Sequence, residues 1–312
     1  GPSGAPDDRP GGGRSDTPVE PTTTTPFDPV MGEVDLVALR ANVRWWLSHP
    51  VRGVVVVGST GESVFLDDEE RRSMVQATRS VVPRDRLLVV GTGAESTRAT
   101  IRRTGAAAEA GADAVLVMPP AFFREAMTPE VLRIHFEAVA DASPVPVILY
   151  QVPLRFCTLE LATGLIRALA EHEKIVGLKD SRGDLALVGR LTESCPPDFR
   201  ILVGSGAHLY ASMELGARGG ILGVANLLPE ACTSLVDAFE KGDHSLAGRL
   251  QERIGPVHEG VVSRFGVAGV KEGLDHLGRA GGPPRPPLQR LRGEDRTRVA
   301  EILDSSGAVG SG

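Results

Sequence analysis

The chain has 312 residues, of which 41% are hydrophobic, and it carries a formal net charge of -6 with an isoelectric point near 5.7. This acidic balance argues against nucleic-acid and anionic-membrane partners, and no apolar run reaches the roughly 18 residues of a membrane helix. Three cysteines without C-x-x-C spacing argue against a disulfide framework or a zinc site and favour a reducing compartment, so we expect a soluble cytoplasmic protein.

The first 25 residues differ in composition from the rest. They contain Gly11-Gly12-Gly13, several prolines and four consecutive threonines, with almost no apolar side chains. This composition is typical of a disordered segment, and the Gly1-Pro2 start resembles the remnant of a cleaved expression tag. We therefore assign residues 1–25 to a disordered tail.

From Asp35 onward, two patterns alternate along the chain. Short β-branched apolar runs predict strands at Gly53–Val57, Arg86–Val90, Ala114–Met118, Val145–Tyr150, Ile175–Leu178, Ile201–Val203 and Gly220–Val224. Amphipathic stretches of helical length lie between them, including Asp68–Val82, Thr97–Ala110, Pro129–Ala142 and Leu159–Ala170. A further strand, the first of eight, would have to lie near Pro18–Pro26, where threonines stand in place of valines.

Strands that alternate with helices predict parallel βαβ units, and eight such units close into a (β/α)8 TIM barrel. The alternative is a doubly wound open sheet, which favours a G-x-G-x-x-G turn after its first strand. Here Gly91-Thr92-Gly93 opens a helix, but Ser96 stands in place of the third glycine and the turn follows the third strand. We therefore predict an α/β chain with a barrel over residues 26–228.

Residues 229–312 are predicted to form an appended helical bundle that packs on the barrel. Helical patterns cover Pro229–Lys241, His244–Val262, Val267–Leu277 and Glu294–Leu303. The prolines of Gly281–Pro287 separate the last two.

One lysine directly follows an apolar strand. Lys179 comes after Ile175–Leu178, and the active site of a TIM barrel lies at the carboxyl ends of its strands. An amine that is partly desolvated there is more readily neutral, and a neutral amine can attack a ketone to form a Schiff base, which serves as an electron sink. The alternative is a solvated lysine paired with Asp180.

Other polar groups are expected at the same end. The phenol of Tyr150, on the neighbouring strand, could move the protons of an aldol reaction or could merely cap the barrel. The loop Gly58-Ser59-Thr60-Gly61 offers hydroxyls and N–H groups suited to a carboxylate, although such residues also cap helices. Because the next helix begins near Asp67, the loop is longer than a cap requires, which favours ligand binding. Gly204-Ser205-Gly206 follows the seventh strand.

Three motifs together resemble the N-acetylneuraminate lyase / dihydrodipicolinate synthase family of class I pyruvate aldolases, over about Thr25 to Leu303. They are Gly58-Ser59-Thr60-Gly61-Glu62, Tyr150-Gln151-Val152-Pro153 and Gly177-Leu178-Lys179-Asp180-Ser181. The stretches Arg86–Thr97, Val267–Lys271 and Gly281–Leu288 are most similar to the 4-hydroxy-2-oxoglutarate aldolase branch.

This resemblance implies a role for each matching residue. Lys179 would form the Schiff base with pyruvate, and Tyr150 and Thr60 would complete the catalytic set. Ser59 and Thr60 would bind the pyruvate carboxylate, and the Gly204 carbonyl and Ile221 would line the pyruvyl pocket. Gly58 and Ser205 are further expected among the substrate-binding residues. The resemblance also implies a homo-oligomer, either a dimer or a tetramer. No metal or organic cofactor is expected, because the imine itself supplies the electron sink.

Two departures from the family pattern concern the second substrate. Many members carry a tyrosine, after strand four, that reaches into the neighbouring subunit's site. Here that loop reads Pro119-Pro120-Ala121-Phe122-Phe123, so Phe122 is expected at the substrate site without a phenol. Arg155 stands where the synthase branch has an arginine for the second substrate's carboxylate, unless it forms a surface ion pair, and the hydroxyoxoglutarate branch typically lacks it. The missing phenol argues against a dihydrodipicolinate synthase, whereas Arg155 favours one, so the two departures disagree on the second substrate.

The leading hypothesis is a Schiff-base aldolase or lyase that cleaves or forms a 4-hydroxy-2-oxo acid such as 4-hydroxy-2-oxoglutarate. A second hypothesis keeps the imine but predicts a dihydrodipicolinate synthase-like condensation or a specialised aldol or dehydration step. A third hypothesis is a barrel that binds a 2-oxo acid as a sensor, without turnover.

Overall fold

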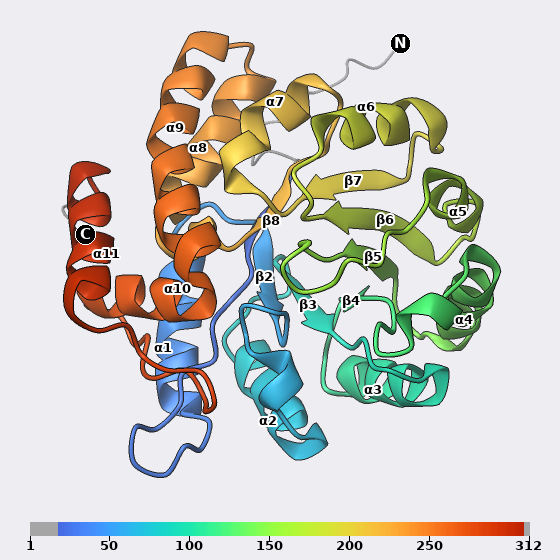
Figure 1. Ribbon diagram of the computed structural model, residues 1–312, viewed down its shortest axis with the longest axis horizontal. Coiled ribbons are helices and arrows are strands. Elements are labelled where there is room, and N and C mark those ends of the chain that lie inside the picture. Colours follow the sequence, from blue (N-terminus) through green and yellow to red (C-terminus); the bar gives the residue numbers. More distant parts are fainter. Residues whose placement is uncertain (1–17, 309–312) are drawn as a thin grey trace, which may run out of the picture.

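The computed structural model describes residues 18–308 and contains eight parallel strands arranged as a barrel (Figure 1). The strands are β1 (Val19–Pro21), β2 (Gly53–Val56), β3 (Leu87–Gly91), β4 (Ala114–Val117), β5 (Val147–Gln151), β6 (Ile175–Asp180), β7 (Arg200–Val203) and β8 (Gly220–Leu222). They are hydrogen-bonded in the order β1-β8-β7-β6-β5-β4-β3-β2. Thr22 bridges to Val55, and the Thr23 N–H donates to the Val55 carbonyl at 2.8 Å, so the two end strands also meet. The predicted TIM barrel is confirmed.

The barrel begins earlier than the sequence indicated. Residues 18–25 lie inside the fold, and β1 pairs with β8 through Glu20 opposite Ile221. The assignment of these residues to a disordered tail is therefore wrong, and the first strand lies where threonines made its pattern faint. The threonine hydroxyls are accommodated because some find backbone acceptors, such as the Thr25 hydroxyl, which donates to the Gly61 carbonyl at 2.6 Å. Residues 1–17 lie outside the described part of the chain, and the tail assigned there stays a prediction.

Helices alternate with the strands and surround them (Figure 1). They are α1 (Leu36–Leu47), α2 (Asp68–Arg79), α3 (Thr97–Glu109), α4 (Pro129–Ala142), α5 (Thr163–Leu169), α6 (Leu185–Ser194), α7 (Leu209–Glu214) and α8 (Pro229–Glu240). Short 3-10 turns precede some of them: η1 (Ser63–Phe65), η2 (Arg124–Ala126), η3 (Gly206–His208) and η4 (Val224–Asn226).

Helix α5 begins later than the predicted Leu159. The side chain of Gln151 accepts a hydrogen bond from the Leu161 N–H at 2.7 Å and donates to the Leu159 carbonyl at 3.2 Å. These bonds fasten the segment to the end of β5, so its backbone groups cannot enter a helix.

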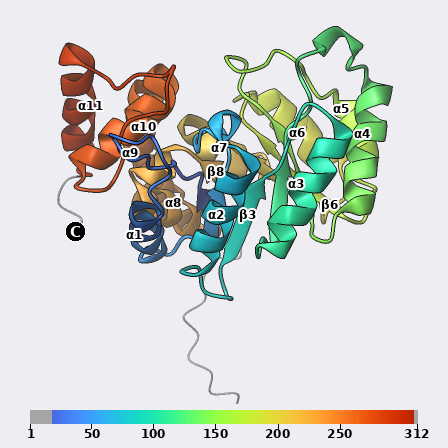
Figure 2. The same cartoon turned by 90° about the horizontal axis from the view of Figure 1, so that it is seen from below.

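The C-terminal helices lie together on one side of the barrel (Figure 2). They are α9 (His244–Val257), the π-helical turn η5 (His258–Ser263), α10 (Arg264–His276) and α11 (Gly293–Ser305). The π turn and the start of α10 carry the helical backbone on to Phe265, beyond the predicted end at Val262. Gly266 is non-helical, with φ 60° and ψ -141°, and it separates this stretch from the helix predicted to begin at Val267. Helix α8 contacts β1 and α7, so it completes the ring of barrel helices and the extension starts at α9.

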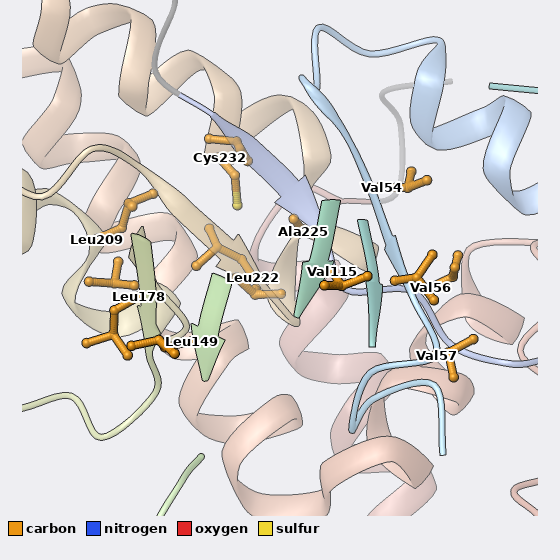
Figure 3. Close-up of a cluster of buried hydrophobic side chains, with 14 of the residues drawn as sticks. Val54, Val56, Val57, Val115, Leu149, Leu178, Leu209, Leu222, Ala225 and Cys232 are labelled. Atoms are coloured by element: carbon orange, nitrogen blue, oxygen red, sulfur yellow. The ribbon is translucent and has the colours of Figure 1, made fainter. Parts of the chain in front are cut away.

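The hydrophobic core has two layers. One fills the barrel interior and includes Val55, Leu116 and Ile221. The other lies between the strands and the helices, and Figure 3 shows part of it, with Val56, Leu149 and Leu178 among the labelled side chains. This outer layer also includes residues of α10 and α11, so the C-terminal extension shares the barrel's core. Within residues 18–308, no helix combines the length and apolar character needed to cross a membrane.

Candidate active site

A cavity of about 830 Å³ opens at the carboxyl end of the barrel. Its walls come from the ends of the strands, with Tyr150 and Lys179 among them, and from η5 and α10 of the C-terminal extension. Its volume lies within the usual range for small-molecule sites. The predicted site residues Ser59, Thr60, Arg155, Gly204, Ser205 and Ile221 line it as well.

Lys179 is enclosed in the floor of this cavity. It lies within β6, opposite Tyr150 of β5, and its side chain and backbone are only 3% exposed. The Nζ atom lies 4.4 Å from the centroid of the Tyr150 ring. A lysine amine in such a site can add to a carbonyl, and the phenol beside it can transfer protons.

The alternative of a Lys179–Asp180 ion pair does not occur in the described chain. Neighbouring residues in a strand point to opposite faces, so the Asp180 side chain leaves the barrel interior. Its Oδ2 accepts a hydrogen bond from the Arg182 N–H at 3.2 Å. Burial raises the pKa of Asp180 to about 6, against the opposing effect of the Arg182 and Gly183 N–H groups.

The loop after β2 places a hydroxyl against the phenol. The Oγ of Ser59 lies 3.2 Å from the Tyr150 hydroxyl. Thr60 lines the cavity, but the structure gives its hydroxyl no such contact, so Ser59 and not Thr60 is the residue paired with Tyr150. Gly58, predicted to bind substrate, does not line the cavity, because its carbonyl accepts the Ser63 N–H at 3.2 Å within the loop.

The backbone of this loop is strained at both of its ends. Val57 has φ 58° and Glu62 has φ 55°, and they are the non-glycine residues with positive φ in the described chain. A β-branched residue rarely adopts this conformation, and each such residue costs about 1–3 kcal/mol. Surrounding contacts must therefore hold the loop in place.

A buried ion pair supplies part of that support. The Lys271 Nζ of α10 lies 2.5 Å from Glu62 Oε1, and both side chains are 1% exposed. Burial lowers the pKa of Lys271 to about 8, while the nearby Glu62 carboxylate opposes this shift. The other Glu62 oxygen accepts the Arg285 N–H at 2.8 Å. The C-terminal extension thus fixes the loop that carries Ser59.

A second wall is formed by the loop after β7. A Cβ on Gly204 would overlap the Ser181 hydroxyl and lie 3.2 Å from Lys179 Cε, so only glycine fits beside the lysine. Ser205 follows it, and its Oγ lies 3.3 Å from Nε2 of His258. Ile221 of β8 is fully buried in the barrel interior.

Arg155 lines the outer part of the cavity. Its Nη1 donates to the Ser263 carbonyl at 2.9 Å, and its guanidinium lies 4.9 Å from the Phe156 ring centroid. No carboxylate among residues 18–308 forms an ion pair with Arg155, so the surface ion pair considered as its alternative role is absent. A guanidinium that lines a cavity and pairs with no carboxylate of the described chain can bind an acidic ligand.

Phe122 does not enter the cavity of its own chain. It is 80% exposed, and its ring packs edge-on against Phe123 with centroids 5.1 Å apart. The reason lies in the backbone, because the N–H groups of Ala121 and Phe122 donate to Glu95 and hold the loop so that Ala121 faces the cavity. A role for Phe122 in a neighbouring subunit's cavity stays a prediction.

Sequence reasoning missed His258, Lys271 and Arg285. Each is far in sequence from the strand ends. Packing of the C-terminal segment brings His258 into the cavity wall and brings the other two residues against Glu62, which lines the cavity. No local pattern marks them, since a lone histidine or lysine in a helix is usually a surface residue.

A barrel whose mouth encloses a lysine, next to a phenol joined to a serine hydroxyl, has the fold and the chemistry of an aldolase-type carbon–carbon lyase. Comparison with known proteins agrees with this class. The model of the "Dihydrodipicolinate synthetase family" matches residues 18–306, and the chain belongs to this family.

Relatives with different names match the chain about equally well. A 4-hydroxy-tetrahydrodipicolinate synthase of Nitrobacter hamburgensis is 37% identical over 268 residues, which is 85% of this chain and 88% of the relative. A "Probable 4-hydroxy-2-oxoglutarate aldolase, mitochondrial" of Emericella nidulans is 34% identical over 278 residues, 88% of this chain and 90% of the relative.

Solved structures agree on the fold. Dihydrodipicolinate synthase from Acinetobacter baumannii, complexed with pyruvate, superimposes with a TM-score of 0.88 at 30% identity, covering 94% of this chain and 99% of that one. The chain is therefore an enzyme of this family, a carbon–carbon lyase. Membership of the family does not by itself determine which relative's substrate the chain uses.

Proposed function

We propose that the protein is a pyruvate-dependent class I aldolase, which cleaves or forms a 4-hydroxy-2-oxo acid through a Schiff base on Lys179. The observation that carries this proposal is the enclosed Lys179 amine, 4.4 Å from the ring of a tyrosine whose hydroxyl meets Ser59. A sensor without turnover has no such support, because the relatives reported above are named as a synthase and an aldolase.

In the proposed reaction, the carboxylate of pyruvate lies against the loop at Ser59 and Thr60. The Lys179 amine adds to the C2 carbonyl, and loss of water gives an iminium. Removal of a proton from C3 then gives an enamine, which attacks the carbonyl carbon of an aldehyde; the aldehyde oxygen takes up a proton and becomes the C4 hydroxyl. Water finally hydrolyses the iminium and releases the 4-hydroxy-2-oxo acid.

Tyr150 is the proposed proton carrier for these steps. Its hydroxyl lies beside Ser59, and its ring lies beside the Lys179 nitrogen, so it can exchange protons with both the substrate oxygen and the serine. Cleavage runs the same steps in reverse. No phenol of this chain extends the relay further, because Tyr210, the other tyrosine, lies in α7 near His244.

Trapping with borohydride tests the imine directly. Reduction of the protein in the presence of pyruvate should add one pyruvyl group per chain, as measured by intact mass. A Lys179→Arg variant keeps the charge and should show no adduct. An unmodified wild-type protein would overturn the proposal.

The proposed aldehyde partner is acidic. This rests on Arg155, whose guanidinium lines the cavity and forms no ion pair within the described chain. Glyoxylate, which would give 4-hydroxy-2-oxoglutarate, fits this requirement. A second candidate is condensation with an aspartate semialdehyde-like partner, favoured by the several relatives that are named 4-hydroxy-tetrahydrodipicolinate synthases.

An aldehyde panel separates these candidates. Pyruvate consumption is measured with glyoxylate, L-aspartate semialdehyde and neutral acetaldehyde, for the wild type and for Arg155→Met, which retains most of the apolar stem. We expect the variant to lose at least about 10-fold in kcat/KM for acidic aldehydes, since a hydrogen bond to a charged group contributes about 1.5–3 kcal/mol, and to leave acetaldehyde unchanged. Arg298→Met serves as the control, because Arg298 is an exposed arginine of α11 outside the cavity. Equal loss for all three aldehydes would contradict recognition of the acid by Arg155.

A further inference from the structure

His258 occupies an unusual place in the cavity wall. It begins the π-helical turn η5 and is 7% exposed. The Gly206 N–H donates to its Nδ1 at 3.2 Å, and its Nε2 lies 3.3 Å from the Ser205 hydroxyl oxygen. Turns of this kind are rare and are frequently found at functional sites.

These two contacts define which ring nitrogen carries the proton. A backbone N–H can only donate, so Nδ1 must be an acceptor and carries no hydrogen. The ring of a neutral histidine then holds its proton on Nε2. Burial, with the nearby charges of Arg155 and His208, lowers the pKa of His258 to about 4, so the ring is neutral at neutral pH.

The direction of the second hydrogen bond follows. Because Nε2 carries the proton, it donates to the Ser205 oxygen, and the Ser205 hydrogen is not used in this contact. Within residues 18–308, Ser205 forms no other side-chain hydrogen bond, and it lines the cavity. Its hydroxyl is therefore available as a donor to a ligand.

The loop that carries Ser205 is rigidly held from the same helical face. Gln251, seven residues before His258 in the chain and thus two turns away, donates to the Gly206 carbonyl at 2.8 Å and accepts the Tyr210 N–H at 2.9 Å. A Cβ on Gly206 would lie 2.5 Å from Val224 Cγ1 and 3.3 Å from His258 Nδ1, so glycine permits the close approach of the ring.

We propose that His258 is a positioning residue that fixes Ser205 as a hydrogen-bond donor to the C4 oxygen of the substrate, the oxygen that comes from the aldehyde. The inference rests on the proposed function. In that function, the loop after β2 holds the pyruvate carboxylate, and Lys179 is bonded to C2. The rest of the substrate then faces the loop after β7. There Ser205 directly follows Gly204, the glycine that packs against Lys179 Cε.

Ser205 and His258 bind rather than transfer protons. A relay through the ring would require Nδ1 to exchange a proton, yet Nδ1 faces an amide N–H that does not release its own. The pair thus differs from Tyr150, and its loss should change binding of the aldehyde half and leave imine formation intact.

Ser205→Ala and His258→Leu test the proposal. For condensation of pyruvate with glyoxylate or L-aspartate semialdehyde, whichever the wild type converts faster, we expect each variant to raise the aldehyde KM by about 3- to 10-fold, the range expected for one hydrogen bond. The pyruvate concentration that gives half-maximal borohydride trapping should stay within about twofold of wild type. The double variant should be no worse than either single variant, because both remove the same contact.

Two further variants separate positioning from a structural role. His258→Asn can offer an acceptor to Gly206 and a donor to Ser205, so it should restore most of the aldehyde KM. His135→Leu is the matched control, because His135 is a buried histidine of α4 whose Nδ1 contacts the Thr97 hydroxyl at 2.9 Å outside the cavity. This control should leave both the aldehyde KM and the pyruvate concentration for half-maximal trapping unchanged.

The outcomes distinguish this inference from the proposed function. No pyruvate adduct in the wild type overturns both. An adduct in every variant with an unchanged aldehyde KM overturns the role of Ser205 and His258 alone. Additive effects in the double variant overturn it as well. A wild-type adduct without turnover of either aldehyde overturns both this role and the proposed acidic partner, and leaves the imine on Lys179 standing.

Discussion

The two walls of the cavity are held in place by different kinds of interaction. The wall after β2, which carries Ser59, has strained backbone at Val57 and Glu62 and is fastened by the buried Glu62–Lys271 ion pair. The wall after β7, which carries Ser205, is fastened by neutral hydrogen bonds from Gln251 and His258. Charge thus supports the proposed imine half of the site, and neutral groups support the proposed aldehyde half. The two walls should therefore respond differently to substitution and to pH.

The largest effect is expected in the imine half of the site, where the Ser59 loop of the first wall meets Tyr150 of β5. Tyr150→Phe keeps the ring beside Lys179 but removes the hydroxyl that meets Ser59. We expect kcat to fall by about 100-fold or more, the usual contribution of a positioned proton carrier, with a smaller change in the aldehyde KM. Steady-state kinetics of the aldehyde panel measures this. A loss confined to the aldehyde KM would remove the distinction between the walls.

Lys271→Met tests the ion pair. It leaves the Glu62 carboxylate buried without its cation. Breaking a buried ion pair in this way lowers the free energy of unfolding by about 3–5 kcal/mol. Chemical denaturation should show this loss, and half-maximal pyruvate trapping should require more pyruvate because the Ser59 loop is no longer held. Lys241→Met, at the exposed end of α8, should stay within about 0.5 kcal/mol of wild type. Equal stability of both variants would contradict the support assigned to this pair.

Acid should affect the second wall through His258. Its pKa is about 4 in the folded chain, below its ordinary value of 6.5, so the unfolded chain takes up this proton first as the pH falls. The associated stability is present above pH 6.5 and is lost as the pH falls toward 4, by about 2 kcal/mol at pH 5. His258→Asn should lose less stability than wild type over this range, as measured by denaturation at pH 7 and pH 5.

The difference between variant and wild type isolates His258 from other buried groups. Burial raises the pKa of Glu20 to about 7, so Glu20 shifts stability in the opposite direction, toward greater stability as the pH falls from 7 to 4.5. Glu20 is present in both proteins and its contribution cancels. Parallel pH curves for wild type and His258→Asn would contradict a buried neutral histidine.

The sequence predicted the fold and one part of the site for the same physical reason. The repeat of apolar residues along a strand or a helix can be read within a short stretch of sequence. It indicated seven of the strands, and it placed Lys179 and Tyr150 at the ends of two of them. The first strand was assigned in part to a tail because threonine does not carry the apolar signal of valine, although its hydroxyls find partners once the barrel closes.

The supporting residues could not be predicted in this way. His258 reaches the cavity, and Lys271 reaches Glu62 in the cavity wall, only because the C-terminal helices pack against the barrel. No local pattern encodes these contacts. The strain at Val57 also has no signal, because a valine before glycine predicts an ordinary extended residue. Phe122 could not be placed from the sequence either. The backbone bonds to Glu95 hold its side chain outside the cavity of its own chain, and its role in a neighbouring subunit's cavity stays a prediction.

The most direct test of the account is the position of the pyruvate adduct. The chain has four lysines, of which Lys179 and Lys271 are buried, Lys174 is half-buried and Lys241 is exposed. After borohydride reduction with pyruvate and proteolysis, peptide mass spectrometry should find the pyruvyl group on Lys179 and on none of the other three. An adduct on Lys271 or on a surface lysine, or an unmodified Lys179, would contradict the central claim.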